Sequence, residues 1–226
     1  MIVFSKKFPF FRRLKFKISG KNNKISDSLK ERGWRGVKLT ISGDNNGVFV
    51  GENNIGKFNI MIFGNNNRVD FEDSVLLGGL SIYIGTPGSP CDNAKVRIGA
   101  GTTFSGPGTF RLMEDDSEIA VGRDVMFSEH VDVWCSDTHS ILNEEGNARN
   151  VGKFIKIGDH VWIGKDVKIS KNTEIKKGSI VGWGSVVPSG TYNEASLIAG
   201  NPARIRRENV VWSRETPKNR NLCRKI

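Results

Sequence analysis

A period of six residues runs through the second half of the chain and constrains its fold more than any other feature of the sequence. Aliphatic residues recur at every sixth position, and small or β-branched residues recur four positions after each of them. The aliphatic positions are Ile157, Ile163, Ile169, Ile175, Val181 and Val187. A helix repeats every 3.6 residues or so and an alternating strand about every two, so neither explains this period. A triangular prism does, because three flat faces of six residues complete a coil of about 18 residues.

Weaker forms of the repeat extend the prism toward the N-terminus. Val121, Phe127 and Val133 keep the same phase, and a G-x-N-N element recurs upstream. Its copies begin at Gly20, Gly43, Gly51 and Gly64. Asn and Gly tolerate left-handed backbone conformations, so these elements suit repeated tight corners. If residues 40 to 200 coil at about 18 residues a turn, roughly nine coils stack to about 43 Å.

Two breaks in the period define the expected organisation. Residues 140–154 are polar and predict a loop that protrudes from a corner, and long loops in a regular solenoid are usually functional. The period also ends after Pro202, where the stretch from Ala203 to Trp212 suits a short basic helix or an irregular tail. We therefore expect a basic N-terminal segment with irregular first coils at 1–40, a β-helix domain at 41–202, and a basic C-terminal tail at 203–226.

The charge lies at the two ends of the chain. The 226 residues carry a net charge of +10, but residues 1–40 contribute +10, residues 41–200 contribute −6 and residues 201–226 contribute +6. No helix-turn-helix, zinc-finger or RNA-recognition signature accompanies this charge, so nucleic acid is not the expected partner. The N-terminal basic residues are interleaved with Phe8, Phe10, Phe11 and Phe16, which favours peripheral association with a membrane surface. An acidic polymer acceptor is the other leading hypothesis for this charge, and a solvated basic surface is the non-functional alternative.

Apolar runs and cysteines narrow the class further. The longest apolar runs are far short of the roughly 20 residues that span a bilayer, which indicates a soluble or peripheral protein. The three cysteines, Cys91, Cys135 and Cys223, show no C-x-x-C spacing, so neither a disulfide framework nor a zinc site is predicted. A cytoplasmic location fits best, possibly at the inner face of the cytoplasmic membrane.

The repeat and its flanks carry a recognisable resemblance. The segments IGDHVWIGKDVKI, GSIVGWGSVV and IAGNPARIRR, preceded by SDTHSI, resemble the hexapeptide-repeat acyltransferases, which fold as a left-handed parallel β-helix. The segment MFSEHVDVWCSDTHSI, followed by the loop and IGDHVWIG, is similar to bacterial O-acetyltransferases that modify capsular polysaccharide or lipopolysaccharide. The resemblance covers residues 119–212. It implies an all-β fold, acetyl-CoA as donor, a sugar hydroxyl group as acceptor, a homotrimer and no metal.

Transfer of an acetyl group to a sugar hydroxyl group requires a base, for which histidine is well suited near neutral pH. Among the three histidines, His139 occupies the position that the resemblance implies for the base, at the start of the loop. Asp137 is expected to orient its imidazole, unless it is an exposed or turn-capping residue. His130 and His160 are expected to be corner or surface residues.

The resemblance also implies a donor site beside the later coils, commonly between two subunits. Its residues are expected to be Trp162, Lys165, Trp183, Gly184, Arg204 and Arg207. Trp162 would provide an apolar wall next to the thioester, the backbone of Trp183 and Gly184 would bind the pantetheine amides, and the arginines would bind the phosphates. The sequence departs from the usual pattern of the family at two places in this site: Trp183 stands where a small residue is usual, and Pro188-Ser189 stand where Thr-Lys is common. The second departure removes a lysine from the expected donor site, and Arg206 and Arg214 are candidates to replace its charge. Interface packing is the alternative role for the tryptophans.

Three other functions remain open at this stage. The first is an acyltransferase of the same fold that acts on an amino-sugar nucleotide or another small acceptor. The second is a non-catalytic β-helix scaffold that binds an acidic partner. The third is a zinc carbonic anhydrase, which also occurs on this fold but uses an H-x4-H arrangement, whereas His130, His139 and His160 are spaced much more widely.

Overall fold

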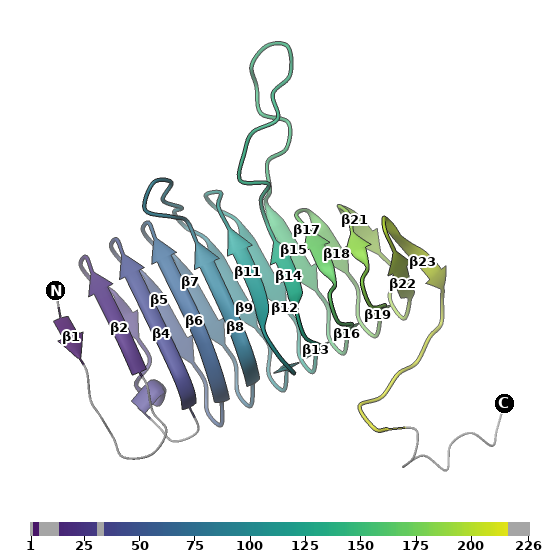
Figure 1. The fold of residues 1–226 in the computed structure, drawn as a ribbon, viewed down its shortest axis with the longest axis horizontal. Coiled ribbons are helices and arrows are strands. Elements are labelled where there is room, and N and C mark those ends of the chain that lie inside the picture. The colour runs from purple at the N-terminus through teal and green to yellow at the C-terminus, as the bar shows by residue number, and fades with distance from the viewer. Residues whose placement is uncertain (1, 5–13, 31–33, 217–226) are drawn as a thin grey trace.

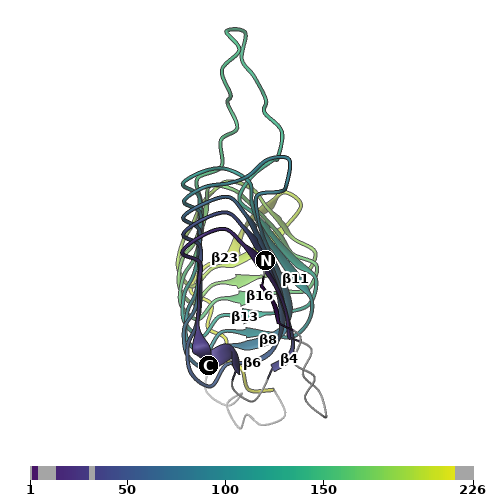
Figure 2. The same cartoon turned by 90° about the vertical axis from the view of Figure 1, so that its left-hand side faces the viewer.

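The computed structural model describes residues 2–4, 14–30 and 34–216, and these form a parallel β-helix. Figure 1 shows successive coils stacked side by side along the long axis, from purple at the N-terminal end to yellow at the C-terminal end. Figure 2 looks along that axis and shows a single long loop that leaves the prism at one corner. The only helical element in the described residues is one turn of 3-10 helix, η1, at Asp27–Lys30.

Short parallel strands form the three faces of the prism. The first face contains β10 (Thr103–Phe104), β13 (Met126–Phe127), β16 (Trp162–Ile163), β19 (Ile180–Val181) and β22 (Leu197–Gly200). The second face contains β11 (Gly108–Leu112), β14 (Val131–Trp134), β17 (Lys168–Ser170) and β20 (Val186–Val187). The third face contains β3 (Lys24–Ile25), β5 (Gly47–Val50), β7 (Arg68–Phe71), β9 (Lys95–Ile98), β12 (Glu118–Val121), β15 (Phe154–Ile157), β18 (Thr173–Ile175) and β21 (Gly190–Tyr192).

The N-terminal coils use longer strands. β2 (Leu14–Ser19) continues the second face, while β4 (Trp34–Ser42), β6 (Ile55–Phe63) and β8 (Leu76–Ile84) each run across the first and second faces. β1 (Ile2–Phe4) pairs antiparallel with β2. Because β2 already pairs in parallel with β4, coiling begins at Leu14, and the boundary expected at residue 40 falls inside β4.

Coil length changes along the solenoid. Trp162 pairs with Ile180, which stands three hexapeptide repeats further along the chain, as the period predicts. Upstream, Val37 pairs with Phe58 and Leu14 pairs with Val37, and both intervals are longer than three hexapeptides. The expectation of uniform three-hexapeptide coils from residue 40 onward is therefore wrong for the first half. The early coils are longer because their faces and corners carry extra residues, including the G-x-N-N elements.

The G-x-N-N elements turn corners, as predicted. Asn22, Asn45 and Asn66 adopt left-handed backbone with φ of 57°, 58° and 58°. The asparagine that follows each of them points inward, and Asn46 and Asn67 are buried. Asn46 Nδ2 donates to the Gly64 carbonyl oxygen at 2.9 Å, and its Oδ1 accepts from the Asn67 backbone N–H at 3.0 Å. This ladder satisfies buried backbone groups that the tight corners leave without a strand partner.

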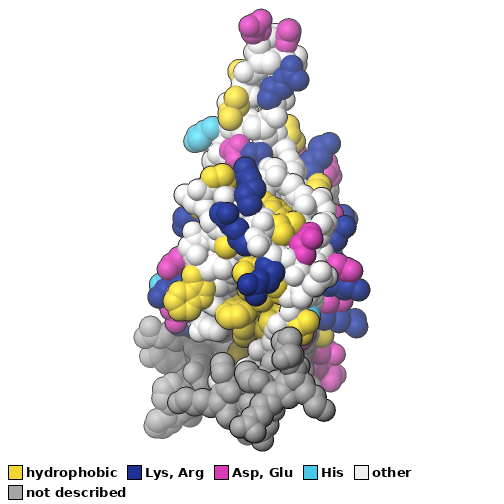
Figure 3. All heavy atoms as spheres, turned by 90° about the vertical axis from the view of Figure 1, so that its right-hand side faces the viewer, with side chains coloured by type: hydrophobic (Ala, Val, Ile, Leu, Met, Phe, Trp, Pro, Cys, Tyr) yellow, Lys and Arg dark blue, Asp and Glu magenta, His cyan; other side chains and the backbone are white. Residues whose placement is uncertain are grey.

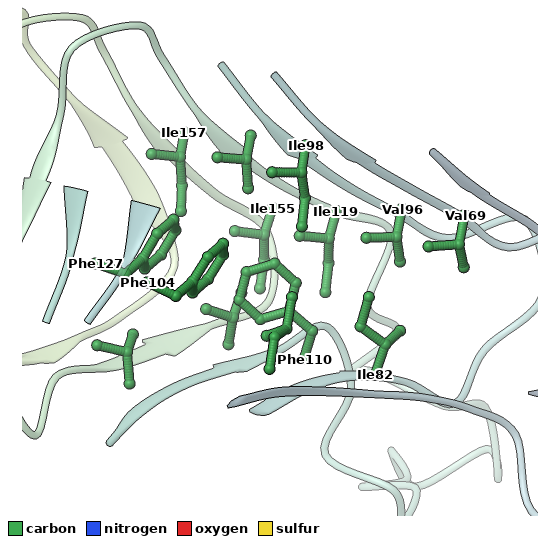
Figure 4. Packing of buried hydrophobic residues seen from close by; sticks show 14 of the residues in the cluster. Val69, Ile82, Val96, Ile98, Phe104, Phe110, Ile119, Phe127, Ile155 and Ile157 are labelled. Carbon is green, nitrogen blue, oxygen red and sulfur yellow. The ribbon is translucent and has the colours of Figure 1, made fainter. Parts of the chain in front are cut away.

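The interior is filled by the residues that set the period. All six aliphatic residues of the hexapeptide series are buried, with at most 3% of their surface exposed. Figure 4 shows phenylalanines of adjacent coils packed with aliphatic side chains from the opposite face. Phe104 and Phe127 stack with ring centroids 4.4 Å apart, and Phe110 meets both rings edge-on. Stacked coils thus bury one continuous apolar core.

Both predicted interruptions exist, with altered bounds. Residues 135–153 form the loop between β14 and β15, so Phe154 belongs to a strand. At the C-terminal end the helical alternative for Ala203–Trp212 is wrong, because β23 (Ala203–Arg207) pairs antiparallel with β22. The last coil otherwise leaves an open strand edge, and β23 satisfies its backbone groups. Residues 208–216 then turn back along the corner between the third and first faces, where Val210 N–H donates to the Ala195 carbonyl oxygen at 2.8 Å.

Candidate active site

The ring of His139 is presented at the base of the long loop. His139 is exposed, and its ring makes no hydrogen bond with any residue that the structure describes. Its backbone is held in place by Asn150 from the other arm of the loop, whose Nδ2 donates to the His139 carbonyl oxygen at 2.9 Å. Asn150 Oδ1 also accepts from the Ile141 backbone N–H at 2.7 Å. The backbone of the histidine is therefore fixed while its imidazole nitrogens stay available to a substrate.

Asp137 lies beside this clip, but its partners are not those expected. Its Oδ2 accepts from Lys171 Nζ and, at 2.8 Å, from Asn150 Nδ2. The ammonium of Lys171 and the amide of Asn150 hold the pKa of Asp137 below its ordinary value. Among the described residues, Asp137 thus binds Lys171 and Asn150 rather than the ring of His139. An orienting role for Asp137 stays a prediction.

A second set of contacts fixes the two stems of the loop to the prism. Glu114 accepts from Ser136 Oγ at 2.9 Å and from the Gly152 backbone N–H at 2.7 Å. Ser136 Oγ in turn accepts from the Thr138 backbone N–H at 2.9 Å, next to a left-handed φ of 69° at Thr138. Sequence reasoning missed Asn150, Glu114 and Lys171. Polar residues in a loop carry no periodic signal, so their pairing becomes visible only when the chain closes on itself.

Trp162 lies on the first face, in β16, at an outward position. Its indole Nε1 is buried and has no hydrogen-bond partner within the described ranges. Buried donors are nearly always paired, so this N–H fits a polar acceptor supplied by a ligand or a second chain. The ring also lies 5.9 Å from the ring of Trp212 in the returning C-terminal segment.

His160 occupies the neighbouring corner and is engaged in a structural contact. Its ring stacks on Trp212 with centroids 4.1 Å apart, and its Nδ1 lies 2.6 Å from Asp124 Oδ2. Arg214 Nε donates to the other oxygen of Asp124 at 2.6 Å. Arg214 is thus bound to Asp124, and the expectation that it compensates for a missing cation in the donor site is not supported by this contact. His130 is an exposed corner residue, as expected, with Nδ1 3.4 Å from Asp166.

Trp183 and Gly184 form an open corner between the first and second faces. Trp183 is 74% exposed, the second most exposed of the large hydrophobic side chains in the described residues after Val211. Gly184 has a φ of +64°, and a Cβ built there would meet nothing within 4 Å, so the space beside its Cα is open, while its N–H donates to the Lys165 carbonyl oxygen at 2.9 Å. Lys165, on the preceding coil, lies 3.5 Å from Glu129. An accessible backbone beside a large exposed ring fits a long, flexible amide-bearing ligand.

Arg204 and Arg207 are exposed on β23 at the C-terminal end of the prism. Figure 3 looks at this end and shows several Lys and Arg side chains gathered over it, around an apolar centre. Arg206 Nε donates to the Ala199 carbonyl oxygen at 3.0 Å. A surface that gathers several guanidinium groups suits the phosphate groups of a ligand.

The remaining features bear on other chemistries. The thiols of Cys91 and Cys135 are buried, and burial raises the pKa of each to about 12, which disfavours a thiolate nucleophile.

Within the described ranges, no cluster of three or more His, Cys, Asp or Glu side chains is placed to hold a metal ion, and no helix is long and apolar enough to cross a membrane. A groove of about 640 Å³ lies on the third face, bordered by Arg97, Lys156 and Glu174, away from His139 and Trp162.

The predicted residues fall into separate places on one chain. His139 and Asp137 lie at the corner between the second and third faces, Trp162 lies on the first face, and Trp183 and Gly184 lie at the corner between the first and second faces. No contact in the described structure joins His139 and Asp137 to the other three. Within the described part of one chain, these residues therefore occupy three separate places.

The chain is similar to polysialic acid O-acetyltransferases, both in sequence and in structure. No family model matches the sequence. A polysialic acid O-acetyltransferase of Neisseria meningitidis is 34% identical over 198 residues, which is 87% of this chain and 88% of the relative. The crystal structure of the polySia-specific acetyltransferase NeuO has a TM-score of 0.80 at 26% identity over 90% of both chains. The polysialic acid O-acetyltransferase OatWY has a TM-score of 0.79 at 30% identity, over 91% of this chain and 94% of OatWY.

Proposed function

The chain belongs to the hexapeptide-repeat O-acetyltransferases of bacterial capsular polysaccharides, a family with a left-handed parallel β-helix, and from this premise we propose its donor, acceptor and catalytic residues. The donor is acetyl-CoA. The acceptor is polysialic acid or a closely related anionic polymer, as the names of the similar proteins suggest. His139 is the general base. The observation that carries this last assignment is the ring of His139, held at the loop base with both nitrogens free of described partners.

The chemistry follows from that geometry. A sugar hydroxyl group is too weak an acid to attack a thioester unaided, so His139 accepts its proton as the oxygen forms the new ester bond to the acetyl carbon. The bond between that carbon and the sulfur breaks, and the departing thiolate takes the proton from the imidazolium. Asp137 is bound to Lys171 and Asn150, so it is not available as a second base.

The donor site uses the residues of the first face and its corner. The donor supplies an activated acyl carbonyl group when it is bound. The unpaired N–H of Trp162 suits a polar atom near the thioester, and the open backbone at Gly184 suits the pantetheine amides. Arg204 and Arg207 suit the phosphates, because guanidinium groups bind phosphate oxygens in pairs. Lys165 lies on the coil before Gly184, whose N–H donates to the Lys165 carbonyl oxygen at 2.9 Å, and its ammonium group adds a cation at that corner.

A homotrimer would assemble these parts into complete sites. Paired outward positions on the first face form a stripe that runs through Ile55, Leu76, Thr103, Met126, Trp162, Ile180 and Leu197. All but Thr103 are apolar, and Ile55 and Leu76 are 46% and 42% exposed. Exposed Ile141 and Leu142 provide further apolar surface on the loop, at the opposite corner of the prism. A stripe this long favours burial against further copies of the same chain, with His139 of one copy facing Trp162 of its neighbour.

The basic N-terminal segment keeps its predicted role at an anionic surface. We propose a cytoplasmic protein that associates peripherally with the inner face of the membrane through residues 1–40. Phe8, Phe10 and Phe11 lie outside the described residues. Phe16 lies in β2, where it packs against the core, so it is not available to insert into a membrane.

The first experiment measures transfer of labelled acetyl groups from acetyl-CoA to a panel of bacterial capsular polysaccharides. We expect polysialic acid to be labelled and His139→Ala to lower kcat by about 10² to 10⁴ while the variant still binds CoA. His130→Ala is the matched control, because His130 is an exposed corner histidine beside a carboxylate, and it should stay close to wild type. Wild-type rates in His139→Ala would exclude His139 as the base. Labelling of neutral polymers alone would exclude the anionic acceptor.

A further inference from the structure

One column of outward-facing side chains on the second face contains none of the proposed catalytic or donor-site residues. Tyr83 of β8 pairs with Arg111 of β11, and Arg111 pairs with Trp134 of β14, so the three side chains stand one above another on consecutive coils. The Cζ of Arg111 lies 4.5 Å from the ring centroid of Trp134 and 5.3 Å from that of Tyr83. The guanidinium group is therefore flanked by two aromatic rings and held in one position.

Arg111 has no anionic partner among the described residues. Its Nε is buried without a hydrogen-bond partner in the described part of the chain, and none of its other nitrogens bonds to a described residue. Two arginines on the third face, by contrast, are paired with carboxylates. Arg68 of β7 lies 2.6 Å from Asp70, and Arg97 of β9 lies 2.8 Å from Glu72. A cation that is partly desolvated and unpaired is costly to keep, and a ligand carboxylate offsets that cost.

The charge around the column favours a polyanion. Beside the column, the outward charges of the second face are Arg111 itself and Asp132, which is paired with Lys168 at 3.3 Å. Two to three coils before Tyr83, the same face carries Lys15, Lys17 and Lys38, so its outward positions are basic along their length. A second copy that presented the same face would be repelled by it. A sugar chain that carries carboxylates is attracted, and the exposed face of Trp134 offers an apolar surface for the C–H groups of a sugar ring.

The position of the column relates it to the reaction. Trp134 is the last residue of β14, and the chain then enters the loop that reaches His139 five residues later. The next rung after Trp134 is Ser170, which precedes the Lys171 that binds Asp137. The three side chains span about 10 Å along the axis of the prism, so a sugar chain bound over them would reach the base of the loop.

We propose that Tyr83, Arg111 and Trp134 form an acceptor subsite, in which Arg111 binds the carboxylate of a sugar residue next to the one that is acetylated. This inference rests on the proposed function and deepens it, because it names the residues that select an anionic sugar chain. The step is one of binding, with no bond made or broken at the subsite itself.

The test uses the full-length wild type and the variants Arg111→Gln and Trp134→Ala. The probes are an oligosialic acid of defined length and the same oligomer with its carboxylates reduced to alcohols. We expect Arg111→Gln to raise KM for the charged oligomer by about tenfold or more with kcat within about twofold, and to leave KM for the reduced oligomer unchanged. Trp134→Ala should raise KM for both oligomers. Arg68→Gln is the matched control, because Arg68 also lies over an aromatic ring, Phe49, at 4.3 Å, and it should change neither.

Direct titration separates failure of this inference from failure of the proposed function. Calorimetry of oligosialic acid against each protein requires no acetyl transfer, and we expect Arg111→Gln to weaken binding by a similar factor. Equal binding by wild type and Arg111→Gln, or no binding to either, would overturn the subsite. A protein that binds oligosialic acid through Arg111 but does not acetylate it would overturn the proposed function alone. If Arg111→Gln or Trp134→Ala changes the mass of the protein assembly in solution, the column is an interface between copies of the chain and the subsite is wrong.

Discussion

At the scale of single residues, the proposed catalytic centre is held together by the side chain of Asn150, which takes no part in the proposed reaction. Asn150 donates from one amide nitrogen to Asp137 Oδ2 and to the His139 carbonyl oxygen, and accepts from the Ile141 backbone N–H. Three bonds from one side chain tie both arms of the loop together. If His139 is the base, as we propose, Asn150 acts as its positioning residue, since it contacts the backbone of His139 and leaves the ring free.

Replacement of this residue tests the clip. We expect Asn150→Ala to lower kcat by about tenfold to a hundredfold, because a misplaced base loses the geometry that proton transfer requires, while KM for acetyl-CoA and the unfolding midpoint change little. Steady-state kinetics and thermal unfolding measure both. Asn147→Ala in the same loop is the control, because only the backbone of Asn147 makes a hydrogen bond in the described structure. An equal loss in both variants would mean that the loop responds to any substitution.

The residue scale also shows where sequence reasoning was limited. A motif predicts His139 as the base, and this assignment stays a prediction; the structure exposes its ring at the start of the loop. The same motif suggested Asp137 as the partner of His139, but Asp137 binds Lys171, which directly follows β17 on the next coil. Two residues separated by a protruding loop and a coil become neighbours only through the stacking of coils.

At the scale of elements, the C-terminal segment after β23 acts as a strap over the later coils. Trp212 stacks on His160 and donates from its Nε1 to the His160 carbonyl oxygen at 2.9 Å. Arg214 reaches Asp124 and, at 2.9 Å, Thr103 Oγ1. Burial alone would raise the pKa of Asp124, but hydrogen bonds from His160 and Arg214 outweigh it and lower the pKa below its ordinary value.

The direction of this pKa shift predicts how the strap responds to acid. Because the pKa of Asp124 is lowered by folding, its contribution is present above the ordinary value near 3.8 and is lost as pH falls through the lower folded pKa. Hydrogen exchange of the Trp212 indole, corrected for the intrinsic effect of pH, should therefore show protection at neutral pH that disappears below about pH 4. Asp124→Asn should lose at least about tenfold of the protection at pH 7. Asp166→Asn is the control, because Asp166 also faces a histidine, His130, and this variant should keep the protection of the Trp212 indole. Full protection in Asp124→Asn would contradict the role of Asp124 in holding the strap.

At the scale of the whole molecule, the prism keeps the proposed active-site parts on different faces. The stacking of coils sends His139 to one corner and Trp162 to another face, and the described coils form one continuous core that holds them apart. The proposed trimer would bring these parts together, because rotation about a threefold axis presents a different face of each copy to its neighbour.

Mixing of two inactive variants tests assembly between chains. His139→Ala keeps Trp162, and Trp162→Ala keeps His139, so a mixed trimer contains interfaces at which both residues are wild type. Co-expression at equal amounts should restore about one quarter of wild-type activity, the fraction of interfaces that combine the two intact residues. Each variant alone should be inactive, and sedimentation should show trimers in every sample. No recovery in confirmed mixed trimers would place the whole site within one chain.

The sequence alone determined the architecture of this protein. A strict period of six with buried aliphatic residues permits only a prism, and G-x-N-N elements and the loss of the period marked corners and the loop, because these signals are local in the chain. Tertiary structure decided what depends on contact between coils: the start of coiling at Leu14, β23 in place of a helix, the partner of Asp137, the Asn150 clip and the Tyr83, Arg111 and Trp134 column. Such contacts join residues that are separated in sequence by a whole coil or loop. Because coil and loop lengths vary along the solenoid, this separation is not constant, and no local sequence pattern predicts the contacts.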